Sequence, residues 1–355
     1  MPIEHIAALL KVIIIPVIAL QCVPILVWIE RRGSAFIQNR LGPRRANIGP
    51  IRLLGLLHLA ADALKFVCKE TFRPAAAHPV YYYLAPALVL VPALASLAML
   101  PLADHISVMG ADIPMSIAEL EYGIAYIFAV SSLSVLGITL AGWASNNKYS
   151  LLGGLRSTAQ MISYEISLGL SLFGTLLVFR SLDLNELARA QGQLLFGVLP
   201  MWGVFVQPLG FLLFLVSAFA EANRLPFDLP EGDSELVAGY HTEYAGMKFL
   251  MFYMSEYVAM ISLSGIIVTL FFGGWQVPWA PTLVLEGMLG QWGRLAAQFG
   301  AFAVKMACCL WFFIWIRWTL PRFRYDQLMA LGWKAILPLS LINIVVTALV
   351  LLVVR

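Results

Sequence analysis

Eight long apolar segments constrain the fold of this chain more than any other feature. Each holds about 20 residues, the length an α-helix needs to cross the hydrocarbon core of a bilayer. Of the 355 residues, 61% are hydrophobic and 12% are charged, whereas soluble domains carry about 25% charged residues. We therefore predict an all-α polytopic membrane protein, a single integral membrane domain over residues 1–355. The predicted spans are 6–29, 81–103, 119–142, 160–180, 200–220, 249–272, 296–318 and 335–354.

The basic residues are concentrated in every second loop. Loops 30–80, 143–159, 221–248 and 317–334 hold 17 of the 23 lysine and arginine residues. Short loops rich in lysine and arginine stay on the cytoplasmic side of a membrane. We therefore expect these four loops to face the cytoplasm and both termini to face the opposite side.

The first of these loops contains an apolar stretch with a polar stripe. Between residues 50 and 70, His58, Asp62, Lys65 and Lys69 recur at helical spacing and share one face. This pattern predicts an amphipathic helix that lies in the membrane interface. The alternative is a surface helix whose polar stripe only meets water.

The third of these four loops, 221–248, is rich in acidic residues. Its six carboxylates are Glu221, Asp228, Glu231, Asp233, Glu235 and Glu243. A solvated loop is one interpretation, and a calcium site is disfavoured because the EF-hand spacing is absent. The fourth loop carries Arg317, Arg322, Arg324 and Lys334, so the two loops are expected to pair and to enclose a polar cavity.

Among the ionisable residues inside predicted spans are Glu165, Glu256 and Lys305. A charge at the centre of a bilayer costs about 2.5–3.5 kcal/mol on insertion scales, so such residues usually serve a function. A buried carboxyl group can exist protonated or ionised, as a proton relay requires. The alternative is an ion pair, such as Lys305 with one glutamate, that only fixes packing.

The sequence contains no pattern for a bound redox centre. Its four cysteines form neither a CxxC pair nor a Cys/His ligand spacing, and nucleotide-binding motifs are absent. We therefore expect no flavin, haem, iron–sulfur cluster or metal in this chain.

Four groups of segments form a distinctive set. They are Glu30–Arg32 with Gln38–Pro43 and Ala61–Lys65; Gly142–Tyr149 with Leu155–Arg156, Ala159–Gln160 and Ser163–Glu165; Ala220–Glu231 with Glu235–Tyr240 and Glu243–Tyr244; and Arg317–Met329 with Leu331–Lys334. Together they resemble the H-subunit family of bacterial NADH:quinone oxidoreductase, the membrane component of respiratory complex I that helps to form the quinone site. They run in the family's order and extend from the first span to the last.

The resemblance implies a subunit that binds quinone as a substrate and couples its reduction to proton translocation. The chamber would involve Arg31, Asp62, Ala63, Lys65, Phe227, Arg317, Arg322 and Arg324. The proton path would include Glu165, Glu221 and Glu256, to which we add Asp228, Glu231, Glu235, Glu243 and Lys305. The implied partners are peripheral-arm subunits on the cytoplasmic side and small and antiporter-like subunits in the membrane. The implied location is the bacterial inner membrane, with both termini periplasmic.

The sequence departs from the family's pattern at several positions. The usual Gly-Pro-Asn-Arg-Val-Gly is replaced around Arg44, Ala46 and Asn47, His58 stands where glutamine is common, and Asp233 replaces a usual glutamate. Two other functions are compatible with the spans. One is the membrane anchor of a related hydrogenase or dehydrogenase. The other is an independent proton-coupled transporter, against which the dense motifs and the lack of a visible internal repeat argue.

Overall fold

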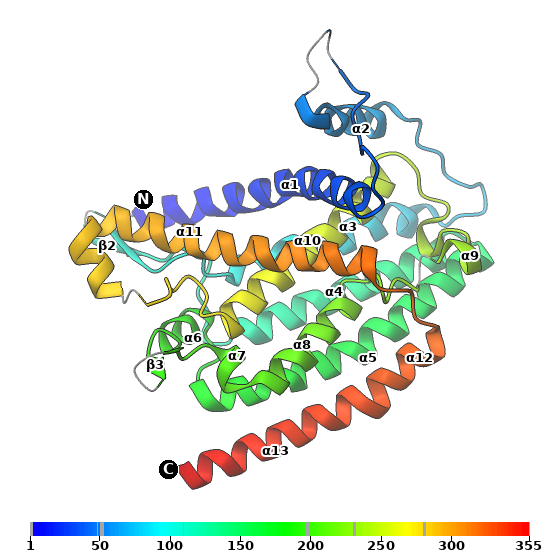
Figure 1. The fold of residues 1–355 in the computed structure, drawn as a ribbon. Helices are drawn as coiled ribbons and strands as arrows, with labels where there is room; N and C mark the ends of the chain where they lie inside the picture. Colours follow the sequence, from blue (N-terminus) through cyan, green and yellow to red (C-terminus); the bar gives the residue numbers. More distant parts are fainter. Residues whose placement is uncertain are drawn as a thin grey trace.

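The protein is a bundle of long helices (Figure 1). The computed structural model describes residues 3–47, 49, 53–108, 110–195, 199–229, 232–279 and 282–354. In these ranges, seven helical segments are long and apolar enough to cross a membrane. They are α1 (Ile3–Ile37), α3 (Pro79–Ala95) with η2 (Ser96–Met99), α4 (Gly123–Ala144), α5 (Lys148–Phe179), α10 (Met247–Phe271), α11 (Thr282–Thr319), and the continuous run of α12 (Tyr325–Ala330), η4 (Leu331–Ile336) and α13 (Leu337–Val354). The prediction of an all-α polytopic membrane protein is confirmed.

The predicted span 200–220 takes a different form. It is divided into α7 (Gly203–Val206) and α8 (Pro208–Glu221), which has 14 residues. The backbone at Gln207 is not helical, with φ −133° and ψ 62°. Proline lacks the N–H that would continue a preceding helix but fits the first turn of a new one, so Pro208 begins a separate, shorter helix.

The smaller elements gather at the two ends of the bundle (Figure 1). We call one the motif end, which carries η1 (Leu53–Gly55), α2 (Leu57–Cys68), α9 (Asp233–Leu236), η3 (Gly239–His241) and α12. We call the other the terminal end, which carries both termini, the antiparallel hairpins β1 (Ile106–Val108) with β2 (Ala111–Ile113) and β3 (Leu194–Leu195) with β4 (Leu199–Pro200), and α6 (Leu184–Ala190). The four loops that hold most of the lysine and arginine residues therefore share the motif end.

The helix predicted between residues 50 and 70 is present but shorter. Within the described part, α2 covers Leu57–Cys68 and keeps Asp62 and Lys65 three residues apart on one face. It ends before Lys69, whose backbone is extended at φ −70° and ψ 131°.

Close packing between helices depends on small residues and buried amides, as in other membrane bundles. At Gly153 of α5, an added Cβ would lie 2.7 Å from the backbone of Gly239, so only glycine allows η3 to approach. Between α8 and α13, the Gln207 amide donates to Thr347 Oγ1 at 2.8 Å and accepts from Asn343 at 3.2 Å. These contacts hold the C-terminal helix on the bundle.

Candidate functional site

A buried carboxylate organises the motif end. Glu30, near the end of α1, lies 2.5 Å from Arg317 of α11 and 3.1 Å from Arg224, which follows α8. The hydroxyl of Tyr257 on α10 donates to the same carboxylate at 2.8 Å. Three helices and one loop therefore meet at a single anion, which balances two arginines. We call Glu30, Arg224, Tyr257 and Arg317 the Glu30 cluster.

Arg224 is the most enclosed cation of this cluster. Its guanidinium lies 4.0 Å above the ring of Tyr257, in cation–π geometry. Burial lowers the pKa of Arg224, but the Tyr257, Glu30 and Glu256 side chains raise it by more, so the pKa lies above its ordinary value. Arg224 is therefore a permanent charge.

The next residue along α1 joins the Glu30 cluster to α2. Arg31 contacts Asp62 at 2.6 Å, and Lys65 contacts the same carboxylate at 3.5 Å. Ala63 is an exposed residue of the same helix. The structure thus brings together Arg31, Asp62 and Lys65, with Ala63 beside Asp62 on the same helix. The resemblance assigned these four residues to the chamber.

Two of the family departures contact one another. The backbone N–H of Ala46 donates to Nε2 of His58 at 3.1 Å. Histidine can accept a hydrogen bond through this nitrogen, as a glutamine can through its amide oxygen. The His58 substitution therefore keeps a hydrogen-bond acceptor for the loop that precedes α2.

The acidic and basic loops pair at one point. Arg322 contacts Asp228 at 3.3 Å, and the backbone N–H of Phe323 donates to the Pro226 carbonyl at 3.2 Å. Phe227 is buried between them, with its ring 5.4 Å from that of Phe323. The predicted pairing of these oppositely charged loops is confirmed at these residues.

The other charged residues of the two loops have separate partners. Glu235 pairs with Arg156 of α5 at 2.5 Å, and Glu243 accepts from Asn147 at 2.6 Å. Arg324 pairs with Asp326 of its own segment at 3.2 Å. Glu231 lies outside the described residues. The structure therefore spreads these predicted site residues over the surface of the motif end.

A cavity whose wall is mainly apolar, with a few polar side chains, lies near the Glu30 cluster. It offers about 70 Å³ of space for water and is lined by Glu221 of α8 and Glu256 of α10, together with the serines Ser96, Ser131, Ser134, Ser255 and Ser262. A water molecule needs about 10–15 Å³ measured in this way, so the cavity has room for several. Tyr240 donates to Glu256 at 3.2 Å. One buried oxygen of Glu221 has no hydrogen-bond partner among the described protein groups. The cavity has room for a water molecule that would donate a hydrogen bond to this oxygen.

Glu165 of α5 accepts a hydrogen bond from Ser132 of α4, and Met161 and Leu168 of the same helix line this cavity. Glu165 is near enough to Glu221 for the two carboxyl groups to interact electrostatically. The three glutamates assigned to the proton path therefore lie in one region.

Lys305 lies elsewhere. Its ammonium donates to the backbone carbonyls of Phe272, Gly274 and Gln276 at 2.8, 3.0 and 2.6 Å, at the terminal end of α10. Sixteen residues of helix separate Glu256 from Phe272, or roughly 24 Å at 1.5 Å per residue. The structure thus places Lys305 apart from the glutamates, where it caps the end of a helix.

The sequence analysis gave no role to Glu30, Arg224 or Tyr257. Two of them stand in the motifs, and Tyr257 directly follows Glu256, but no local pattern pairs residues so far apart. Among the described residues, no group of three or more histidine, cysteine, aspartate or glutamate side chains could hold a metal ion.

Comparison of the sequence with known proteins places this chain in a family. The family model for NADH dehydrogenase matches residues 10–348. The chain is 47% identical to the H subunit of NADH-quinone oxidoreductase from Bdellovibrio bacteriovorus, over 96% of this chain and 95% of the relative. It is 44% identical to an H subunit from Geobacter metallireducens, over 97% and 96% of the two chains. It is 47% identical to the H subunit from Salinibacter ruber, over 92% and 90%. The chain therefore belongs to the H-subunit family of NADH-quinone oxidoreductase, a membrane component of a multi-subunit oxidoreductase.

Proposed function

We propose that this subunit forms part of the quinone chamber and couples quinone reduction to proton translocation. Quinone is the substrate of the complex. The chamber would lie at the motif end, between α2 and the loops that carry Phe227, Arg317 and Arg322, with Arg324 at its outer edge. The proton path would run through Glu221, Glu256 and Glu165.

One observation carries this proposal. Three chain segments each supply one residue to the Glu30 cluster. Within three positions of that residue, each segment also supplies a residue to the proposed chamber or to the cavity. On α1, Glu30 is followed by Arg31, which pairs with Asp62. On α10, Tyr257 follows Glu256, and after α8, Arg224 comes three residues after Glu221.

These neighbours give a physical route for coupling. When quinone takes up protons, charges near Arg31 and Asp62 change. Two charges about 4 Å apart interact by about 4 kcal/mol at an effective dielectric constant of 20. A shift of Glu30 relative to its two arginines would change the field at Glu256, which interacts electrostatically with Arg224, and Glu221 lines the same cavity as Glu256. The acidic-loop residues Asp228, Glu235 and Glu243 would supply the path at the surface of the motif end.

The proposed setting is the bacterial inner membrane, with the motif end in the cytoplasm and both termini in the periplasm. The basic residues of the four loops at that end favour this orientation. Peripheral-arm subunits would then cover the motif end, and small and antiporter-like subunits would lie beside the bundle. The redox centres would belong to other subunits.

A photoreactive quinone tests the chamber directly. Irradiation of membranes that contain the complete complex should label peptides of α1 and α2 near Arg31 and Ala63, and excess natural quinone should suppress the labelling. The Asp62→Asn variant, which weakens the contact to Arg31, should reduce it, whereas Asp112→Asn in the β1–β2 hairpin should not. Labelling that excess quinone leaves unchanged, or that spares α1 and α2, would contradict the proposed chamber.

A further inference from the structure

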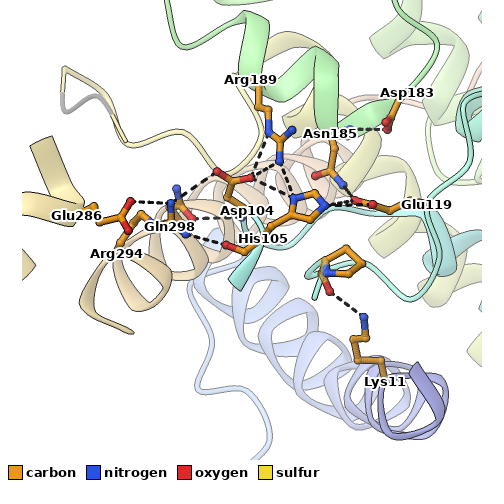
Figure 2. A network of polar contacts seen from close by, with 11 residues as sticks. Lys11, Asp104, His105, Glu119, Asp183, Asn185, Arg189, Glu286, Arg294 and Gln298 are labelled. Carbon is orange, nitrogen blue, oxygen red and sulfur yellow. Dashed lines mark hydrogen bonds and ion pairs between the residues drawn. The ribbon is translucent and has the colours of Figure 1, made fainter. Parts of the chain in front are cut away.

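Charged side chains outside the Glu30 cluster are paired differently at the two ends of the bundle. At the terminal end they form a connected network (Figure 2). Asp104 accepts two hydrogen bonds from Arg189 of α6, at 2.7 and 3.2 Å. Arg294 of α11 pairs with Glu286 at 3.1 Å. These groups neutralise one another inside the protein.

At the motif end, Lys148 lacks such a partner. It is exposed at the start of α5 and forms no ion pair with any residue that the structure describes. It lines a groove of about 800 Å³, whose wall also includes the segment before α3, the end of α4 and Glu243 of loop 221–248. Ligand pockets have volumes of about 300–1,000 Å³, whereas one water molecule needs about 10–15 Å³. The groove therefore has room for a molecule rather than for a single ion or water.

Three aromatic rings mark the level of this groove in the membrane. His78 and Trp143 line the groove, and Tyr81 packs against both. The ring centroids are 4.7 Å apart for His78 and Tyr81, 5.7 Å for Tyr81 and Trp143, and 6.1 Å for His78 and Trp143. Tryptophan and tyrosine gather where lipid headgroups meet the hydrocarbon core. Three spans, α3, α4 and α5, also begin or end within a few residues of these rings, so the groove lies at the depth of lipid headgroups.

Hydrogen bonds hold the wall of the groove in place. The N–H of His78 donates to the Ala144 carbonyl at 3.0 Å, which joins the start of α3 to the end of α4. The Asn147 amide is used at both atoms. Its oxygen accepts from the N–H of Tyr149 at 2.9 Å and caps α5, and its nitrogen donates to Glu243 at 2.6 Å. The groove is therefore preformed, with the carboxylate of Glu243 fixed in its wall.

Besides His78, the groove presents one charged side chain of each sign. Lys148 supplies an ammonium group and Glu243 a carboxylate, and both line the same space. A phosphate would find a cation there, and an ammonium group would find an anion, and hydrogen bonds between charged groups are the stronger ones. The pair of charges therefore matches a zwitterionic headgroup better than a purely anionic one, which Glu243 would repel.

An apolar stripe leads from the groove into the membrane. Leu151 lines the groove, and Leu155, Ile162 and Ile166 follow it at helical spacing on one face of α5, each between 40% and 52% exposed. Ile162 lies eleven positions after Leu151, or roughly 16 Å along the helix. This is about half of the hydrocarbon core of ~30 Å, the depth of one leaflet. An acyl chain attached to a headgroup in the groove can therefore lie along α5.

We propose that this groove binds a phospholipid with an ethanolamine headgroup: Lys148 pairs with the phosphate, Glu243 pairs with the ammonium group, and an acyl chain lies along Leu151 and Leu155. The lipid would bridge the start of α5 and loop 221–248. This proposal requires neither the quinone chamber, nor the proton path, nor the orientation, so its test is separate from theirs.

Photolabelling of the complete complex in a defined bilayer tests the site. The complex is placed in nanodiscs of phosphatidylglycerol that contain a trace of phosphatidylethanolamine with a photoreactive acyl chain. Peptides around Leu151 and Leu155 should be labelled more strongly than those around Leu349, on the exposed face of α13. Unlabelled phosphatidylethanolamine should suppress this excess. Glycerophosphoethanolamine, the same headgroup without acyl chains, should not.

Three variants make the test specific. Lys148→Gln should lower the labelling near Leu151 roughly two- to fivefold, the range expected for an exposed ion pair. Glu243→Gln can still accept from Asn147 but loses its charge, so the preference for the ethanolamine over the glycerol headgroup should disappear. The control is Lys334→Gln, an exposed lysine of the motif end outside the groove, which makes the same change of charge and should leave the labelling unaltered.

Three outcomes would overturn the lipid site. One is labelling near Leu151 that only equals that of α13 in the unaltered complex, as a groove filled by a partner subunit would give. Another is labelling that Lys148→Gln leaves unchanged. The third is full suppression by glycerophosphoethanolamine, which would indicate a soluble ligand in place of a lipid.

Discussion

Glu30 and Arg224 lie 194 positions apart in the sequence and form an ion pair of 3.1 Å, in which their side chains are only 7% and 4% exposed. Arg317 contacts the same carboxylate at 2.5 Å. Removing one partner of a buried pair is costly because the other charge remains without compensation. In this cluster, removing the carboxylate costs more than removing one guanidinium, because the single carboxylate of Glu30 pairs with two arginines.

The first prediction concerns this inequality. Glu30→Gln leaves two arginines facing each other and should destabilise the subunit by about 3–5 kcal/mol. Arg224→Gln leaves Glu30 paired with Arg317 and removes two guanidinium nitrogens that have no hydrogen-bond partner among the described groups, so it should cost less, about 1–3 kcal/mol. The thermal transition and the yield of assembled complex measure both effects. Equal losses, or a larger loss for Arg224→Gln, would refute this account of the cluster.

The sequence predicted the spans well because apolar length is a local property. Its one clear misfit, 200–220, arises from Pro208, which divides the segment into α7 and α8. The helix predicted over 50–70 appears over Leu57–Cys68. A polar stripe at helical spacing predicts that a helix forms, but it does not predict at which residues the helix begins and ends.

Contacts between distant segments were not predictable in the same way. Glu30, Arg224 and Tyr257 belong to separate elements, and no spacing along the chain relates them. The partners of Lys305 are backbone carbonyls, which every residue possesses and which therefore leave no pattern in a sequence. The lysine and arginine bias and the predicted spans did indicate which loops would gather at one end, because together they fix the direction of each crossing.

The second prediction assigns Lys305 a structural role. Lys305→Met leaves three carbonyls at the end of α10 without their donor and should destabilise the complex by about 1–3 kcal/mol. Quinone-linked turnover for each assembled complex should be nearly unchanged. The matched control is Val304→Met, on an adjacent exposed face, which should alter neither property. A tenfold loss of turnover with unaltered thermal stability would instead place Lys305 on the proton path.

The third prediction concerns orientation. In a background without the four native cysteines, Asn146→Cys and Asp326→Cys at the motif end should react with an impermeant reagent from the cytoplasmic side of sealed vesicles. Glu121→Cys at the terminal end should react only from the other side. The reason is the concentration of lysine and arginine in the loops at the motif end. Reaction of Asn146→Cys and Asp326→Cys from opposite sides would refute the topology.

The fourth prediction concerns cofactors. The subunit, once separated from its partners in mild detergent, should show no visible absorption and no stoichiometric iron or zinc, because its sequence lacks ligand and nucleotide motifs. Absorption spectra and elemental analysis of the single polypeptide measure this. A chromophore or a stoichiometric metal that remains with the purified chain would contradict the prediction.

Coupling is the central claim, and paired activities of carboxylate variants test it most directly. Glu165→Gln and Glu256→Gln keep size and polarity but lose the titratable group, so the complex should still assemble. Quinone-linked NADH oxidation and proton translocation should fall on the order of 100-fold or more, whereas oxidation by an artificial acceptor at the peripheral arm should persist. Glu→Asp at either position should be milder, and the exposed Glu121→Gln should have no effect. Full quinone-linked turnover and full proton translocation in both Gln variants, at matched complex content, would contradict the proton path and leave these glutamates as packing residues.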